Sequence, residues 1–172
     1  MFGLPLHPVI VHFPIVLVFL LPAACIAALW AIRRGSSFRR AWSIPLAVAG
    51  ALAVSAFVAL RTGENEEERV ERVVSERALH SHEESAERFL LLSGALLVVA
   101  AGGLANGAFG RVARAATAFG AAALVAAGAQ VGHSGGSLVY REGAASAYAQ
   151  RTTVGGDVAP HAPAEAREHD ER

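Results

Sequence analysis

Long runs without any charged residue constrain the fold of this chain more than any other feature of its sequence. The chain has 172 residues, and its uncharged runs lie at 1–32, 41–60, 89–110 and 115–140. A helix needs about 20 consecutive apolar residues to cross the hydrocarbon core of a bilayer. Because each run reaches that length, we expect transmembrane helices near residues 8–32, 42–61, 82–108 and 112–134.

The composition argues against the soluble alternative, a bundle of buried helices in a water-soluble protein. Charged residues make up 17% of the chain, whereas soluble domains carry about a quarter. A surface helix of a soluble protein should also present a polar face at helical spacing, and the first run presents none. The sequence therefore predicts an all-α integral membrane protein, a four-helix bundle in a lipid bilayer.

The placement of arginine predicts the orientation of this bundle. Arginines without neighbouring acids occupy two of the three connections, as Arg33, Arg34, Arg39, Arg40, Arg111 and Arg114. The remaining connection, 62–88, is rich in Glu. Short Arg-rich loops stay in the cytoplasm. We therefore expect an N-out/C-out, multi-pass protein of the cytoplasmic (inner) membrane, with both termini and the 62–88 loop on the periplasmic side.

The 62–88 loop and the C-terminal tail differ in their patterning. In the loop, Val70, Val73 and Val74 recur at helical spacing, which predicts a short amphipathic helix over the outer face of the bundle. The tail is rich in Ala, Gly, Pro and charge, without an apolar period, and is typical of disorder. We predict a transmembrane domain over 1–143 and a disordered polar tail over 144–172.

Several classes of function are excluded or disfavoured by the composition. The 15 Arg balance 15 Asp and Glu, so there is no basic surface for nucleic acid. The single cysteine, Cys25, excludes a disulfide framework and Cys-rich metal sites. No zinc-protease H-E-x-x-H pattern, Ser-His-Asp spacing or phosphate-binding glycine loop is present, so an enzyme is the less favoured expectation.

Histidines gather at the predicted outer end of the bundle. Titratable residues inside a membrane are by default functional candidates. Under the expected topology, residues of the type that ligates metals reach this end from every span, as His7, His12, Glu64, His80, His82 and His133. His12 and His133 lie deepest, so we expect them to be the main ligands, with His82 and Glu64 as a third ligand or as supporting hydrogen-bond partners. His80 is expected to be an interfacial histidine.

The chemistry of imidazole suggests which cofactor these residues would hold. Neutral imidazole suits Zn, Cu and Fe, including haem iron. Gly132, Gly135 and Gly136 could leave an apolar slot beside His133. We expect haem b or a His-ligated transition metal in a non-catalytic, redox-associated membrane subunit. The alternative is a structural or assembly subunit of a larger membrane complex, with no cofactor and with the histidines as interfacial anchors.

Two motifs carry a resemblance to a known family. The chain reads LPLHPVIVHFPI at 4–15 and GHSGGSLVYREG at 132–143, with TGE at 62–64 and HE at 82–83. These segments resemble a widespread domain-of-unknown-function family of bacterial membrane proteins, whose members are predicted four-helix proteins that open with L-H-P-x-x-V-H-F-P-I. The resemblance covers about residues 4–143.

The resemblance implies a site and a setting without implying an activity. By matching position it highlights His7, His12, Glu64, His82, His133, Gly135, Gly136 and Tyr140. Some similar proteins occur near or fused to cytochrome-like modules, which implies a redox setting. The resemblance therefore implies a protein of the bacterial inner membrane, with other membrane subunits and redox proteins as partners.

Overall fold

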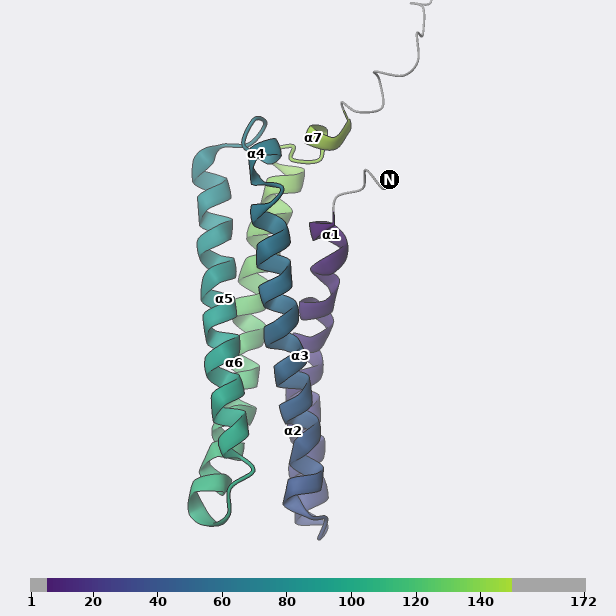
Figure 1. Cartoon of the computed structure of the whole chain (residues 1–172), viewed down its shortest axis with the longest axis vertical. Helices are drawn as coiled ribbons and strands as arrows, with labels where there is room; N and C mark the ends of the chain where they lie inside the picture. Colours follow the sequence, from purple (N-terminus) through teal and green to yellow (C-terminus); the bar gives the residue numbers. More distant parts are fainter. Residues whose placement is uncertain (1–5, 150–172) are drawn as a thin grey trace, which may run out of the picture.

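Four long helices lie side by side and make up almost all of the molecule (Figure 1). The computed structural model describes residues 6–149, without the side chains of the last two. The helices are α1 (His7–Ile10), α2 (His12–Arg33), α3 (Phe38–Glu64), α4 (Glu67–Val70), α5 (Glu76–Gly102), α6 (Gly107–Tyr140) and α7 (Ser146–Ala149). The described residues contain no strand. The predicted all-α four-helix bundle is thus confirmed.

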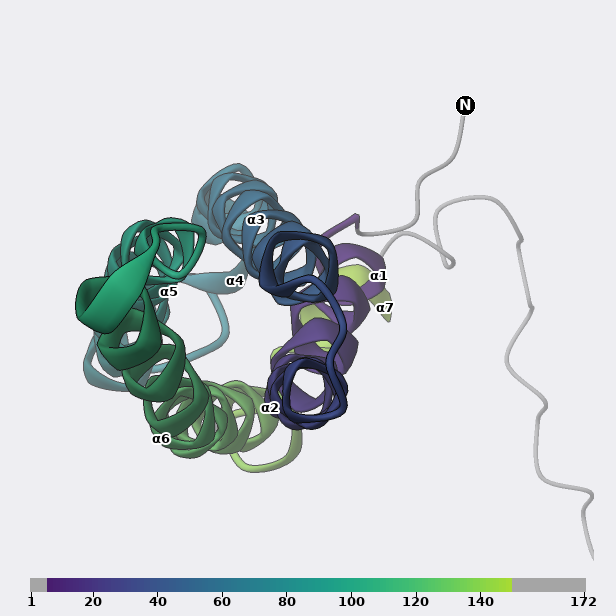
Figure 2. The ribbon, with the colours of Figure 1, turned by 90° about the horizontal axis from the view of Figure 1, so that it is seen from below.

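The long helices form a closed ring when seen along the bundle (Figure 2). Each packs against two neighbours, in the order α2, α3, α5, α6 and back to α2. All four are long and apolar enough to cross a membrane, with α1 and α2 counted as one span. The expected number of spans is therefore correct, and consecutive spans run antiparallel because the connections between them are short.

The turn between the last two spans lies earlier in the chain than expected. We had placed it around Arg111 and Arg114, but α5 ends at Gly102 and α6 begins at Gly107. Gly107 has φ of +72°, a left-handed conformation that glycine adopts without strain. Arg111 and Arg114 correctly indicate the end of the bundle at which α5 and α6 are connected. The position of the turn itself depends on Gly107, because glycine adopts the left-handed conformation found there. Both arginines consequently lie on the first turns of α6.

The first span is interrupted near its start, just before Pro14. Pro14 has no amide hydrogen, so the carbonyl of Ile10 lacks its usual helical donor. The structure places the break there, because α1 ends at Ile10, Val11 forms a turn and α2 starts at His12. Pro22 lies inside α2, which continues through it.

The core is narrow because many buried side chains are small. Trp42 is the largest fully buried side chain, and its indole Nε1 donates a hydrogen bond to the Ala100 carbonyl at 2.9 Å. A Cβ on Gly103 would lie 2.1 Å from the same indole nitrogen, so only glycine fits there. The Arg114 guanidinium donates to the Gly103 carbonyl and lies over the Phe38 ring, 4.9 Å from its centroid. These contacts join α3, α5 and α6 at one end.

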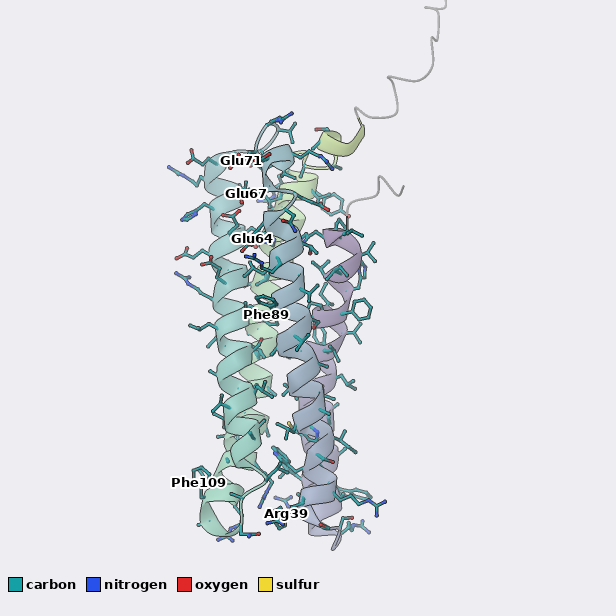
Figure 3. All side chains as sticks on the ribbon, viewed as in Figure 1. Arg39, Glu64, Glu67, Glu71, Phe89 and Phe109 are labelled. Carbon is teal, nitrogen blue, oxygen red and sulfur yellow. The ribbon has the colours of Figure 1, made fainter. Side chains whose placement is uncertain are left out.

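The two ends of the bundle carry opposite charge (Figure 3). Arg39 and Phe109 mark the end with the turns 34–37 and 103–106, which we call the arginine end. Glu64, Glu67 and Glu71 mark the other, which we call the acidic end; it also holds α1, α4 and α7.

The acidic end is capped by a small apolar cluster. Val74, Leu79, Leu138 and Ala144 are buried there, with Val70 and Val73 packed against them. The valines of the 62–88 loop therefore pack onto the bundle, and the predicted short helix is α4. Ala144 and α7 belong to the segment for which a disordered tail was predicted, and 150–172 lie outside the described residues, so the domain boundary at 143 stays a prediction.

Candidate histidine site at the acidic end

His7 and His82 are the two histidines that the fold brings together. Their ring centroids are 6.5 Å apart and the ring planes are nearly perpendicular, at 80°. His7 is the first residue of α1, and His82 lies in the second turn of α5. Both side chains are half-buried. Residues 75 positions apart thus form a pair of imidazoles between elements that are not consecutive in the chain.

Hydrogen bonds define the tautomer of His7. Its Nδ1 lies 2.9 Å from the Ala59 carbonyl oxygen and 3.4 Å from Thr62 Oγ1. The Thr62 hydroxyl donates its own proton to the same carbonyl, at 2.9 Å. A carbonyl oxygen only accepts, so Nδ1 of neutral His7 carries the hydrogen and donates it. The lone pair of the ring is therefore on Nε2.

His82 has the same tautomer for a similar reason. Its Nδ1 lies 2.9 Å from Ser134 Oγ, and the Ser134 hydroxyl donates to the Val131 carbonyl at 3.0 Å. Because the serine proton is already used, the hydroxyl oxygen accepts from Nδ1–H of His82. The neutral His82 ring also keeps its lone pair on Nε2.

Two glycines allow the rings to lie directly against helix backbone. A Cβ on Gly63 would come within 3.2 Å of His7 Cε1, and one on Gly135 within 3.0 Å of His82 Cε1. Gly63 belongs to α3 and Gly135 to α6. We expected Gly135 to leave room for a cofactor beside His133, but the space next to it is occupied by the His82 ring.

Glu66 holds the start of α1 in place. Its Oε1 accepts hydrogen bonds from the backbone amides of Leu6, at 2.8 Å, and His7, at 3.4 Å. Amides at a helix N-terminus are otherwise unpaired, and a carboxylate there is favourable. The loop after α3 thus positions the residue that carries one imidazole.

The expected ligands His12 and His133 lie elsewhere. Both side chains are exposed, and over residues 6–149 no hydrogen bond or ring contact involves either of them. Glu64 is also exposed, and its carboxylate pairs with Arg61 on the same helix at 2.7 Å. His80 is exposed as well. Within the described part of the chain, no group of three or more His, Cys, Asp or Glu could hold a metal ion.

The predicted slot around His133 is an open surface depression. It measures about 310 Å³ and is lined by Gly132, His133, Gly136, Ser137, Tyr140 and Arg141. Four of these residues were predicted to bind a cofactor, and they share one side of α6 because of their helical spacing. All the lining residues come from α6 and its C-cap, so no second helix closes the depression.

Sequence reasoning missed the residues that orient the two rings. Ser134 lies inside the GHSGG motif, next to His133, and this position is the one sequence feature that could have identified it as a functional residue. Glu66 is one of several glutamates in an acid-rich loop, so its sequence context does not distinguish it. Thr62 and Gly63 lie within the TGE motif, in which the sequence predicts only Glu64 as a candidate ligand.

Fold and site together define a polytopic, all-helical membrane protein with paired histidines at the acidic end of a four-helix bundle. The chain belongs to a family described as predicted membrane protein (DUF2231), whose family model matches residues 3–147. The resemblance seen in the sequence motifs is thereby confirmed. Comparison with curated proteins and with solved structures finds no match.

Proposed function

We propose that this protein is a non-catalytic membrane subunit that binds haem iron or another transition metal through His7 and His82 and serves a redox complex. One observation carries the proposal: both rings donate from Nδ1 to protein oxygens and keep an Nε2 lone pair, with the rings 6.5 Å apart. Histidines that ligate metals almost always donate their other ring N–H in this way, which raises the basicity of the ligand.

The separation of the rings suits one shared ion. Metal to imidazole nitrogen distances are about 2.0–2.1 Å, so two imidazoles that shared one ion would have ring centroids no more than about 6 Å apart. The separation of 6.5 Å between His7 and His82 is close to that value.

The number of ligands favours some metals over others. A structural zinc site takes four protein ligands, and residues 6–149 offer no third His, Cys, Asp or Glu in a suitable group. Haem iron would need only one or two protein ligands, since the macrocycle supplies the others. The number of ligands therefore favours haem b, with copper as an alternative that imidazole also suits.

The orientation of the bundle determines which partners could reach the site. The arginine end is expected to face the cytoplasm, which places His7 and His82 at the periplasmic face of the inner membrane. A cofactor held there is accessible to periplasmic redox proteins and to other membrane subunits.

The proposal is tested on the purified full-length chain by visible spectroscopy and elemental analysis. Wild type is expected to show a Soret band or one bound metal per chain. His7→Asn and His82→Asn are expected to remove it, because asparagine keeps an amide donor but has no imidazole ligand. His80→Asn, two residues before His82 and exposed, is the matched control and should keep the cofactor. A wild-type protein without haem or metal would contradict the proposal.

A second candidate function is that of a structural or assembly subunit. Both Nδ1 hydrogen bonds join different helices, α1 to α3 and α5 to α6, so the histidines fasten the acidic end without any metal. In that case the wild type contains no metal. His82→Asn, which keeps a donor, unfolds at the same temperature as wild type, whereas His82→Ala unfolds at a lower temperature.

A further inference from the structure

We propose that the arginine end binds one anionic phospholipid, with an acyl chain in a groove between α2 and α3 and the phosphate between Arg34 and Arg40. The groove measures about 240 Å³ and is lined by Ala24, Ala27, Ala28, Ala31, Ala41 and Ile44. This site is separate from the histidine pair, which lies at the acidic end.

The groove exists because alanine side chains are too short to fill the angle between the two helices. Only Ile44, on α3, contributes a larger side chain. Ile44 and Ala27 are both exposed, so the groove opens on the outer surface of the bundle rather than into its core. In a membrane that surface faces lipid, and an apolar groove there is filled by an acyl chain.

Two arginines continue the faces that line the groove. Residues three or four apart share a helix face, so Arg34, the C-cap of α2, follows Ala31, and Arg40 lies one turn before Ile44 on α3. Both side chains are exposed. In the part of the chain that the structure describes, neither forms an ion pair with a carboxylate, and no Asp or Glu occurs between residues 1 and 63. Positive charge therefore lies at the turn 34–37, next to the end of the groove that Ala31 and Ala41 line.

Trp30 holds one of these charges at the membrane surface. The Arg34 guanidinium carbon lies 4.8 Å from the centroid of the Trp30 ring, and Trp30 is 60% exposed. Exposed tryptophan is typical of the headgroup layer, and an arginine over its face is held by a cation–π interaction. Arg114, by contrast, is buried and already bonded to the Gly103 carbonyl.

The combination of groove and charge selects a lipid over a free anion. Inorganic phosphate would use the arginines but not the apolar groove, and a zwitterionic lipid would use the groove but bring no net negative charge to balance the two arginines. A phospholipid with a net negative headgroup satisfies both features, because its phosphate accepts from guanidinium groups while its chain covers the alanines.

The charge requirement is tested by native mass spectrometry of the detergent-solubilised full-length chain, titrated with dioleoyl phosphatidylglycerol or dioleoyl phosphatidylcholine. We expect one tightly bound phosphatidylglycerol and weaker binding of phosphatidylcholine. Arg34→Gln/Arg40→Gln should weaken phosphatidylglycerol binding by about tenfold, since each surface arginine contributes substantially to anionic-lipid affinity. Arg111→Gln, exposed at the same end but on α6, should not. Equal affinities for the two lipids, or an unchanged double variant, would overturn the proposal.

The groove requirement is tested by filling the groove without changing charge. Ala27→Leu/Ala31→Leu should reduce phosphatidylglycerol binding by a similar factor while circular dichroism stays that of wild type. Inorganic phosphate at millimolar concentration should not displace the lipid. Displacement by phosphate would indicate a simple anion site. A change of oligomeric mass in the leucine variant, without loss of lipid, would indicate that a second copy of the chain covers the groove. Displacement by phosphate and a change of oligomeric mass would each reject the lipid site.

Discussion

At the scale of single residues, the acidic end depends on hydrogen-bond acceptors that orient histidine rings. Ala59 and Ser134 each accept from an Nδ1–H at 2.9 Å, and Glu66 fixes the backbone that carries His7. None of these three residues would ligate the metal in the proposed site. They determine the tautomer and the orientation of the two imidazole rings instead.

Replacing Ser134 with alanine is expected to weaken cofactor binding without unfolding the protein. The change removes the acceptor of the His82 Nδ1–H, so the ring loses its fixed tautomer. Loss of such a partner typically lowers metal affinity by about 10–100-fold. The measurement is competition with a chelator or, for haem, titration followed at the Soret band. Ser137→Ala on the same helix is the control, and an equal effect of both variants would contradict the assignment.

Replacing Gly135 with alanine is expected to displace the His82 ring. The new Cβ would lie 3.0 Å from Cε1, whereas an alanine at Gly132 would meet nothing within 4 Å. Overpacking of this kind costs about 1–3 kcal/mol. Thermal unfolding in detergent should therefore occur at a lower temperature for Gly135→Ala than for Gly132→Ala. Equal unfolding temperatures for Gly135→Ala and Gly132→Ala would mean that the close contact between the His82 ring and α6 is not maintained in solution.

At the scale of helices, a few contacts at the arginine end hold the bundle together across its small-residue core. The Trp42 indole joins α3 to α5, and the Arg114 guanidinium joins α6 to the end of α5. In lipid, helix association depends on close packing and interhelical hydrogen bonds, because lipid tails are as apolar as the side chains. Each buried polar contact here also satisfies a group that could not be left unpaired.

Trp42→Phe is expected to destabilise the bundle, whereas Trp30→Phe is not. The first change removes the hydrogen bond to the Ala100 carbonyl from a fully buried ring, and the second alters an exposed ring. The hydrogen bond and the lost packing together should cost about 1–2 kcal/mol. Thermal unfolding monitored by circular dichroism gives the comparison. A Trp42→Phe protein as stable as wild type would contradict a stabilising link between α3 and α5 through the Trp42 indole.

At the scale of the whole molecule, charge divides the protein into two chemically different ends. The arginine end has several exposed arginines, a groove and an exposed tryptophan, while the acidic end has the histidine pair and its hydrogen-bond partners. The membrane-spanning helices between them are uncharged over most of their length. This division is the basis for placing the proposed cofactor outside and the proposed lipid contact inside.

The orientation can be measured by labelling cysteines from one side. Ser36→Cys lies in the turn at the arginine end and Ser75→Cys before α5 at the acidic end, and both positions are exposed. The native Cys25 is fully buried and should not react. In spheroplasts, a membrane-impermeant maleimide is expected to label the Ser75→Cys variant only. Labelling of the Ser36→Cys variant alone would reverse the topology and place the histidine pair in the cytoplasm.

The sequence by itself determined the class of protein, the number of spans and the grouping of charges. These features depend on local quantities, namely run length, hydropathy and the position of arginines, which a bilayer selects directly. The packing of the loop valines was predictable for the same reason, since helical spacing acts over a few residues.

Only the tertiary structure decided which histidines meet. His12 and His133 were chosen by depth in the membrane, but depth does not determine which face of a helix a residue occupies. The packing order of α2, α3, α5 and α6 turns His7 and His82 toward each other and leaves His12 and His133 exposed. The groove between α2 and α3 likewise depends on how closely two alanine-rich faces approach. Rotation of each helix about its axis is set by packing against its neighbours, and so it cannot be read from any one segment.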